Sequence, residues 1–221
     1  MLIADGVATQ TSAQLTSHLL CEQCEQRLGL LDRSAADAAY TRSGECPIIS
    51  QLGAERRRSE DEVSFADAVD VETEQLAAFG VSVVWRLHAG SRHVELGPYA
   101  EDARSFLVGE APFPRAFRVL LGVYFDPARP ESPGDPMATM IAILASDRAE
   151  RARRHRFLLC GLQFEVVVGQ HFSPYFDELC LHHATTKQVA VLIPSANTLR
   201  SIGKTRASAR PVGRLARLAR R

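Results

Sequence analysis

The hydrophobic pattern of this chain changes its period near Pro114, and this change decides the fold class. Before Pro114, apolar residues recur every three or four positions, as on one face of a helix: Leu76, Phe79, Val83, Val84 and Leu87. After it, apolar residues occupy every second position, as in a half-buried strand: Phe117, Val119, Leu121, Val123 and Phe125. The sequence therefore predicts helices first and strands afterwards.

The helical part contains two helices, and the later part contains about four strands. Gly90 suits the end of the first helix, and a second helix begins at Gly97-Pro98 with Ala103, Phe106 and Leu107 on its inner side. Three more stretches are rich in β-branched and aromatic residues: Met137–Ala145, Phe157–Val168 and Gln188–Ile193. No helical pattern separates these stretches, which favours an antiparallel meander. We expect an α+β fold, with helices packed on one face of a roughly four-stranded, mainly antiparallel sheet.

Composition divides the chain into three parts. Residues 1–62 are polar and irregular, and end in the charge-dense stretch 55–62, which is typical of a loop or linker. Residues 63–202 form the α+β domain. Residues 203–221 hold seven bases and no acid in a chain of zero net charge, so the rest of the chain is acidic. We expect this basic tail to be disordered.

Such a tail can contact nucleic acid or an acidic partner surface. The residues that would make these contacts are Lys204, Arg206, Arg210, Arg214 and Arg217. Because the tail has no aromatic residue to stack on bases, any contact with nucleic acid would be made to phosphate, without sequence preference.

The chain shows no sign of a membrane helix or a secretion signal. No apolar run approaches the roughly 18–20 residues that span a bilayer. Residues 1–13 lack a basic segment followed by an apolar core. Five cysteines, an odd number, then favour reduced thiols or metal ligands over disulfides. We expect a cytoplasmic protein.

The most specific chemical motif is the Cys-x-x-Cys formed by Cys21 and Cys24. Two thiolates at this spacing can hold one Zn²⁺ from the same side, but a structural zinc needs four ligands. Candidates for the remaining ligands are Cys46, which precedes a proline, and the cluster of Cys180, His182 and His183; His18 and Cys160 are weaker candidates. The alternatives are a pair of inert reduced thiols or a redox pair. A redox pair of the thioredoxin type would follow a strand and open a helix in a βαβ unit, which the sequence does not indicate.

Two segments together resemble a family of uncharacterised bacterial proteins, over about residues 15–108. The first is HLLCEQCEQRLGLLDR, and the second is FGVSVVWRLHAGSRHVELGPYAEDARSFL, which contains Trp85-Arg86. Some members of that family carry a further Cys-x-x-Cys and a His-bearing segment upstream, similar to HNH-type nucleases, where two Cys pairs clamp zinc. The residues before Cys21 contain neither that second pair nor the expected His. The resemblance therefore implies a degenerate zinc site or a truncated or divergent relative of HNH-type nucleases.

The other notable residues suit structural roles. Trp85 is expected in the core, with Arg86 exposed or paired with a carboxylate, and His88 and His93 are expected at the surface. Residues 171–178 mix aromatic and acidic side chains and are expected to cap the sheet. The sequence contains no nucleophile elbow, phosphate loop, dinucleotide fingerprint or zinc-protease motif.

We therefore expect a non-catalytic protein that binds zinc through Cys21 and Cys24, in a complete or a degenerate site, and whose basic tail contacts nucleic acid or an acidic partner. One alternative is the HNH-type metal-dependent nuclease relative. Another is a metal-free interaction domain. The sequence assigns no catalytic residue, so it leaves open whether the protein is an enzyme.

Overall fold

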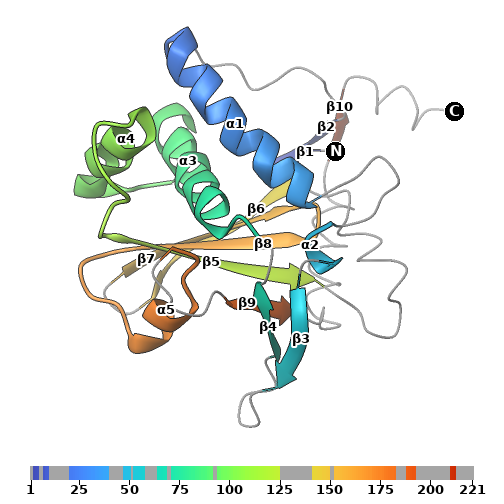
Figure 1. Ribbon diagram of the computed structural model, residues 1–221. Helices are drawn as coiled ribbons and strands as arrows, with labels where there is room; N and C mark the ends of the chain where they lie inside the picture. The colour runs from blue at the N-terminus through green and yellow to red at the C-terminus, as the bar shows by residue number, and fades with distance from the viewer. Residues whose placement is uncertain are drawn as a thin grey trace, which may run out of the picture.

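The fold is built around helix α3 (Thr73–Ser91), which lies against strands β5 (Phe117–Tyr124) and β8 (Leu162–Val168) (Figure 1). The computed structural model describes residues 2–4, 7–9, 20–39, 47–50, 52–57, 64–68, 71–91, 94–124, 141–149, 152–182, 188–192 and 210–212. Helices α1 (Glu22–Ala39) and α4 (Ala100–Val108) pack beside α3 and form one helical layer above the sheet. Shorter helical segments are α2 (Pro47–Ser50), η1 (Gly97–Tyr99) and α5 (Pro174–Leu179).

The centre of the sheet is an antiparallel run of four strands in the order β6-β7-β8-β5, where β6 is Ile141–Ala149 and β7 is Ala152–Leu159. Short strands widen this centre on both sides. Beyond β6 lie β1 (Leu2–Ala4), β2 (Val7–Thr9) and β10 (Arg210–Val212); beyond β5 lie β9 (Gln188–Leu192), β4 (Ser64–Ala68) and β3 (Leu52–Arg57). The pairs β1–β6, β2–β10 and β5–β9 are parallel. The predicted α+β fold with a mainly antiparallel sheet is confirmed.

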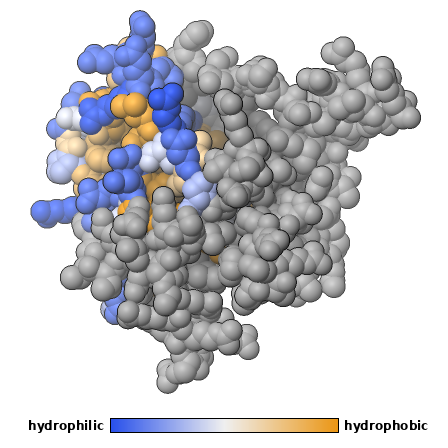
Figure 2. Space-filling model, turned by 45° about the vertical axis from the view of Figure 1, so that its right-hand side comes forward, coloured by the Kyte–Doolittle hydropathy of each residue, from blue (hydrophilic) through white to orange (hydrophobic). Residues whose placement is uncertain are grey.

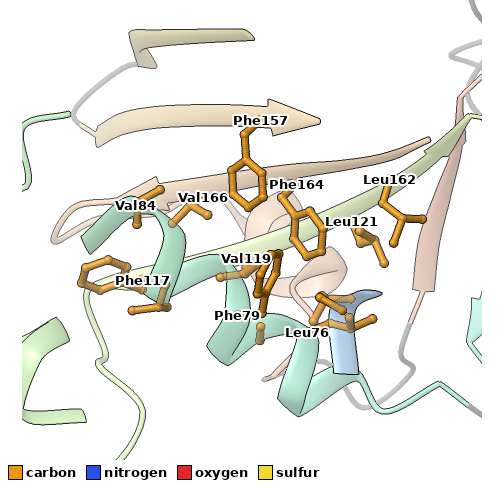
Figure 3. Packing of buried hydrophobic residues seen from close by; sticks show 14 of the residues in the cluster. Leu76, Phe79, Val84, Phe117, Val119, Leu121, Phe157, Leu162, Phe164 and Val166 are labelled. Atoms are coloured by element: carbon orange, nitrogen blue, oxygen red, sulfur yellow. The ribbon is translucent and has the colours of Figure 1, made fainter. Parts of the chain in front are cut away.

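Three phenylalanines form the centre of the core (Figure 3). Phe157 and Phe164 lie directly opposite each other on β7 and β8, with stacked rings 4.8 Å apart. Phe79 of α3 meets both rings edge-on, at centroid distances of 6.0 and 5.3 Å. Such aromatic pairs add about 0.5–1.5 kcal/mol each beyond the area that they bury. The trio therefore fixes where α3 crosses the sheet.

The two predicted helices and the alternating strand are found where the periods place them. Helix α3 spans the apolar stripe that includes Leu76 and Phe79, and Trp85 is buried. η1 and α4 follow from Gly97, with Ala103 and Leu107 buried. The inward positions of β5 are buried, as the period-two pattern predicted. In the part of the chain that the structure describes, no helix is long and apolar enough to cross a membrane.

The structure differs from the sequence prediction in three places. Residues 1–62, predicted to be irregular, contain α1, whose buried residues Leu28, Ala35 and Ala39 join the same hydrophobic cluster as α3. Stretch 55–62, predicted as a loop, begins within β3. Phe157–Val168, predicted as one strand, is a hairpin that turns at Cys160-Gly161, where both φ angles are positive. Helix α1 and strand β3 contain too few large apolar residues to show a periodic pattern. The hairpin was not predicted because Cys160 is not a usual turn residue. Of the predicted tail, only Arg210–Val212 lies within the described residues.

Gly80 allows α3 to approach β5 closely. A Cβ atom at this position would lie 2.9 Å from Cγ1 of Val119 and 3.4 Å from Cγ2 of Val166. We predict that Gly80→Ala lowers the free energy of unfolding by about 1 kcal/mol, because overpacking costs about 1–3 kcal/mol and the better helix propensity of Ala returns at most about 1. The measurement is urea denaturation of the two proteins.

The matched control is Gly29→Ala in α1, where a Cβ atom would meet nothing within 4 Å. There only the propensity changes, so the free energy of unfolding should rise by about 0.5–1 kcal/mol. Equal effects of the two substitutions would contradict the close approach of α3 to the sheet.

Candidate functional site

Cys21 is the N-cap residue of α1. Its carbonyl accepts the first helical hydrogen bond, from the N–H of Glu25 at 3.0 Å, and Cys24 is then the third residue of the helix. The side chain of an N-cap residue normally accepts a hydrogen bond from the backbone N–H of the second or third helical residue. Cys21 is consistent with this rule, since the backbone N–H groups of Cys24 and Gln23 both lower the pKa of its thiol. The first turn of α1 therefore holds both thiols of the motif together.

The two sulfurs of this pair differ in their acidity. The pKa of Cys21 lies below its usual value, because the backbone N–H of Cys24 and then the Cys24 thiol donate hydrogen bonds to it. The pKa of Cys24 lies above its usual value, because its thiol proton is held in that hydrogen bond. Cys21 is exposed and Cys24 is half-buried. The pair thus combines an exposed sulfur of lowered pKa with a half-buried sulfur of raised pKa.

Two guanidinium groups lie near the pair and act on Cys24. The charges of Arg27 and Arg104 both lower its pKa, against the stronger effect of the hydrogen bond to Cys21. Arg27 follows Cys24 by one helical turn and donates to the carbonyl of Val108 at 3.2 Å, which joins the start of α1 to the end of α4. Arg104 of α4 is held by Glu101 at 2.8 Å and Glu110 at 2.9 Å. The dithiol therefore sits at a fixed junction of two helices.

Within the described part of the chain, the structure does not assemble the predicted zinc ligands. Cys180 is buried after α5, where its thiol donates to the carbonyl of Asp177 at 3.4 Å, and the ring of His182 stacks on Phe113 at 3.7 Å. No three side chains of His, Cys, Asp or Glu among the described residues could hold a metal ion together. Outside the described residues lie Cys46, His183, His18 and His93, and the tail residues Lys204, Arg206, Arg214 and Arg217; of Arg210 only the backbone is described.

Residues 171–182 lie along the edge of β5, in agreement with the predicted capping role. Arg118 of β5 pairs with Asp177 at 2.6 Å, and its guanidinium lies over the ring of Phe172 at 4.3 Å. The N–H of Leu181 donates to the carbonyl of Val119 at 2.8 Å. These contacts hold α5 in place, so the aromatic and acidic side chains of this segment have a structural explanation.

A polar pair that the sequence analysis missed joins β6 to β7. Nδ1 of His155 lies 2.9 Å from Oγ of Ser146, directly across the two strands. Burial, and then the charge of Arg153, lower the pKa of His155 to about 4, so the imidazole is neutral at pH 7. Nε2 is buried without a partner among the described residues. A nucleophile and its base are normally accompanied by a third group that orients the base, and the described residues supply none to this pair.

The outer face of the same strands carries a network of opposite charges. Asp147 accepts two hydrogen bonds from Arg154, at 2.9 and 3.1 Å, and a third from Arg156 at 2.9 Å. Arg154 also faces Glu165 at 3.8 Å. These pairs lower the pKa of Asp147, while burial raises the pKa of Glu165. The charges of this network are paired with one another within the sheet, which gives them a structural role. The dithiol is therefore the candidate functional site.

The hydrogen bond between the two sulfurs can be tested through the acidity of Cys21. We predict that Cys24→Ala raises the pKa of Cys21, because the side-chain donor is lost, whereas Cys24→Ser keeps a hydroxyl donor and raises it less. The measurement is the pH dependence of alkylation at Cys21 by iodoacetamide, located by peptide mapping. Identical pKa values in the two variants would show that the Cys24 side chain does not act on Cys21.

The buried imidazole of His155 should make stability depend on pH. Its pKa in the folded protein, about 4, lies below its ordinary value of 6.5, so its contribution is complete above pH 6.5 and is lost as the pH falls towards 4. The loss should reach up to about 3 kcal/mol. The measurement is urea denaturation between pH 7 and pH 4.5 of the wild type and of His155→Leu, so that carboxyls that also titrate in this range, such as Glu165 with its raised pKa, contribute to both proteins alike. His155→Leu should flatten this dependence, and an unchanged slope would argue against a buried neutral imidazole.

Comparison with known proteins assigns no function to this chain. No protein-family model, no curated protein and no solved structure matches the chain. The function must therefore be argued from the geometry of the described residues alone.

Proposed function

We propose that Cys21 and Cys24 form a redox-active dithiol that exchanges with disulfides of other molecules. The observation that supports this function most directly is the N-cap position of Cys21, whose exposed sulfur has a pKa lowered by the backbone N–H groups at the start of α1 and by the thiol of Cys24. Thiols at helix N-termini and beside cations ionise at lower pH and react faster as nucleophiles. Of the two features that we expected around a thioredoxin-type motif, the pair does open a helix, whereas the described residues place that helix in no βαβ unit.

The proposed reaction uses the two sulfurs in turn. The Cys21 thiolate attacks a substrate disulfide, forms a mixed disulfide with one substrate sulfur, and releases the other as a thiolate, which takes up a proton. Cys24 then loses its proton and attacks the Cys21 sulfur. This step closes the Cys21–Cys24 disulfide and releases the second substrate thiol. Two thiols of the protein are oxidised and one substrate disulfide is reduced, so electrons and protons balance.

Zinc binding by the same pair is a second proposal, because both sulfurs lie on one helical turn. Two observations favour the redox function over it. The described residues supply no third ligand to Cys21 and Cys24. The guanidinium groups of Arg27 and Arg104 favour thiolates but repel a divalent cation. A cytoplasmic location, which we also propose, would keep the pair reduced between reactions.

The contact of the basic tail with nucleic acid or an acidic partner stays a prediction, as does the relationship to HNH-type nucleases. Both depend on residues outside the described part of the chain. Neither conflicts with a dithiol at the start of α1, which lies at the surface of the helical layer (Figure 1).

The test is incubation of the reduced protein, purified without added metal, with oxidised glutathione. In the wild type, peptide mapping should find a disulfide between Cys21 and Cys24. Cys24→Ser should stop at a mixed disulfide with glutathione on Cys21, and in Cys21→Ser the remaining thiol of Cys24 should form its mixed disulfide much more slowly, because that thiol is half-buried and has a raised pKa. The serine of Cys21→Ser keeps a good N-cap, so this variant is also a control for folding.

Two results would contradict the redox function. One is a wild-type protein whose two thiols stay free in oxidised glutathione. The other is stoichiometric zinc, found by elemental analysis, that is lost in the Cys21→Ser/Cys24→Ser protein and protects the pair from oxidation. The second result would establish the zinc site instead.

A further inference from the structure

We infer that the groove along α1 holds the polypeptide segment next to the disulfide on which Cys21 acts. This inference rests on the proposed redox function and names its substrate class: an extended segment of a disulfide-bonded polypeptide, with apolar side chains, an acidic residue near its cysteine and a basic residue further along.

The groove has a volume of about 680 Å³ and lies between α1, the start of α3 and the end of α4. Its apolar floor includes Leu31 of α1, Leu76 of α3 and Phe106 of α4. Leu30, also in its wall, is 66% exposed and is the one exposed large apolar side chain among the described residues. Figure 2 shows apolar surface between polar side chains over the described helices. The groove thus offers apolar contact that the described residues leave open to solvent.

The groove begins next to the dithiol, because Cys24 and several residues that line the groove lie on the same side of α1. Residues 24, 27, 31, 34 and 38 follow one another at alternating spacings of three and four, which places them on one side of the helix. Arg27, Leu31, Ser34 and Ala38 line the groove. Cys24 is the residue of this stripe before Arg27, and the charge of Arg27 acts on Cys24. A substrate chain that leaves the dithiol along this side of α1 therefore enters the groove.

The length of the groove suits a short extended segment. Residues 27–38 of α1 span about 17 Å at the rise of an α-helix. An extended chain covers this length with about five residues. Since alternate side chains of an extended segment point to the same side, two or three of them would face the apolar floor.

The charges along the groove give the segment a direction. Arg27 lines the end nearer the dithiol, Arg33 lies near the middle, and Asp37 lines the far end. Glu72, just before the start of α3, lines the same far end of the groove as Asp37, because α3 runs antiparallel to α1 (Figure 1). An acidic side chain close to the substrate cysteine and a basic one about four residues further on would meet these groups with opposite charge.

The test compares the rates at which the protein reduces three disulfides. The first is oxidised glutathione, which reports on the dithiol alone. The second is a glutathione mixed disulfide of a peptide that has a cysteine, an acidic residue, apolar residues and a terminal lysine, and the third is the same peptide with serine in place of the apolar residues. In the wild type, the second-order rate constant for oxidation of the pre-reduced protein in a single turnover should be about tenfold higher with the apolar peptide than with the serine peptide, because contact with the groove buries roughly two apolar side chains in part.

Two groove variants and one matched control sharpen the comparison. Leu30→Gln should reduce the preference for the apolar peptide several-fold. Arg33→Glu should reverse the preference between the peptide and a version with its acidic and basic residues exchanged. Arg115→Glu changes the charge of an exposed arginine outside the groove and should leave both preferences as in the wild type.

The outcomes separate the inference from the function on which it rests. If no disulfide is reduced, the redox function fails. If oxidised glutathione is reduced but the wild type does not distinguish the two peptides, the groove inference is overturned and the dithiol function stands. If removal of residues 213–221 raises the single-turnover rate constant for the apolar peptide, the chain's own tail occupies the groove, which also overturns the inference.

Discussion

The attachment of α1 to α3 is the constraint on which both the dithiol and the groove depend. Only Leu28, Ala35 and Ala39 of α1 are fully buried, and the two alanines bring the helices close together without filling much space. Arg86 of α3 adds a forked contact to Asp32, with N–O distances of 3.0 and 2.6 Å. Both partners are partly exposed, so this ion pair contributes at most about 1 kcal/mol of stability. Packing therefore provides the stability of the attachment, and the ion pair fixes its register.

The register matters because α1 carries its functional groups along one side. A rotation of α1 by one residue, about 100°, would turn Cys24 and the stripe that follows it away from α4. The fork of Arg86 on Asp32 and the bond from Arg27 to the Val108 carbonyl oppose such a rotation from two different neighbours. The position of the dithiol thus depends on α3 and α4, which are themselves fixed by apolar packing on the sheet.

The elements that could be predicted from the sequence are those whose burial rests on large apolar side chains. Helix α3 and strand β5 bury leucine, valine and phenylalanine at regular intervals, and the period alone identifies them. Helix α1 buries mainly alanine, which does not stand out in a polar sequence, and β7 starts among arginines that pair with Asp147 and Glu95. Period two does hold there, since His155 and Phe157 both point inward. A strand whose residues form ion pairs with neighbouring strands cannot be recognised from the spacing of its apolar residues alone.

The sequence identifies the Cys-x-x-Cys motif of the candidate site but does not predict how the two thiols differ in reactivity. Cys-x-x-Cys shows that two sulfurs are close, yet the difference in their acidity arises from where α1 begins, and no usual N-cap residue marks that point. The groove could not be predicted either, because its walls come from three helices that are distant in sequence. The two features explain one another in the proposed reaction. Cys21, at the exposed end, would meet the substrate disulfide, while Cys24, at the head of the groove, would lie beneath the bound segment, where its attack on Cys21 releases that segment.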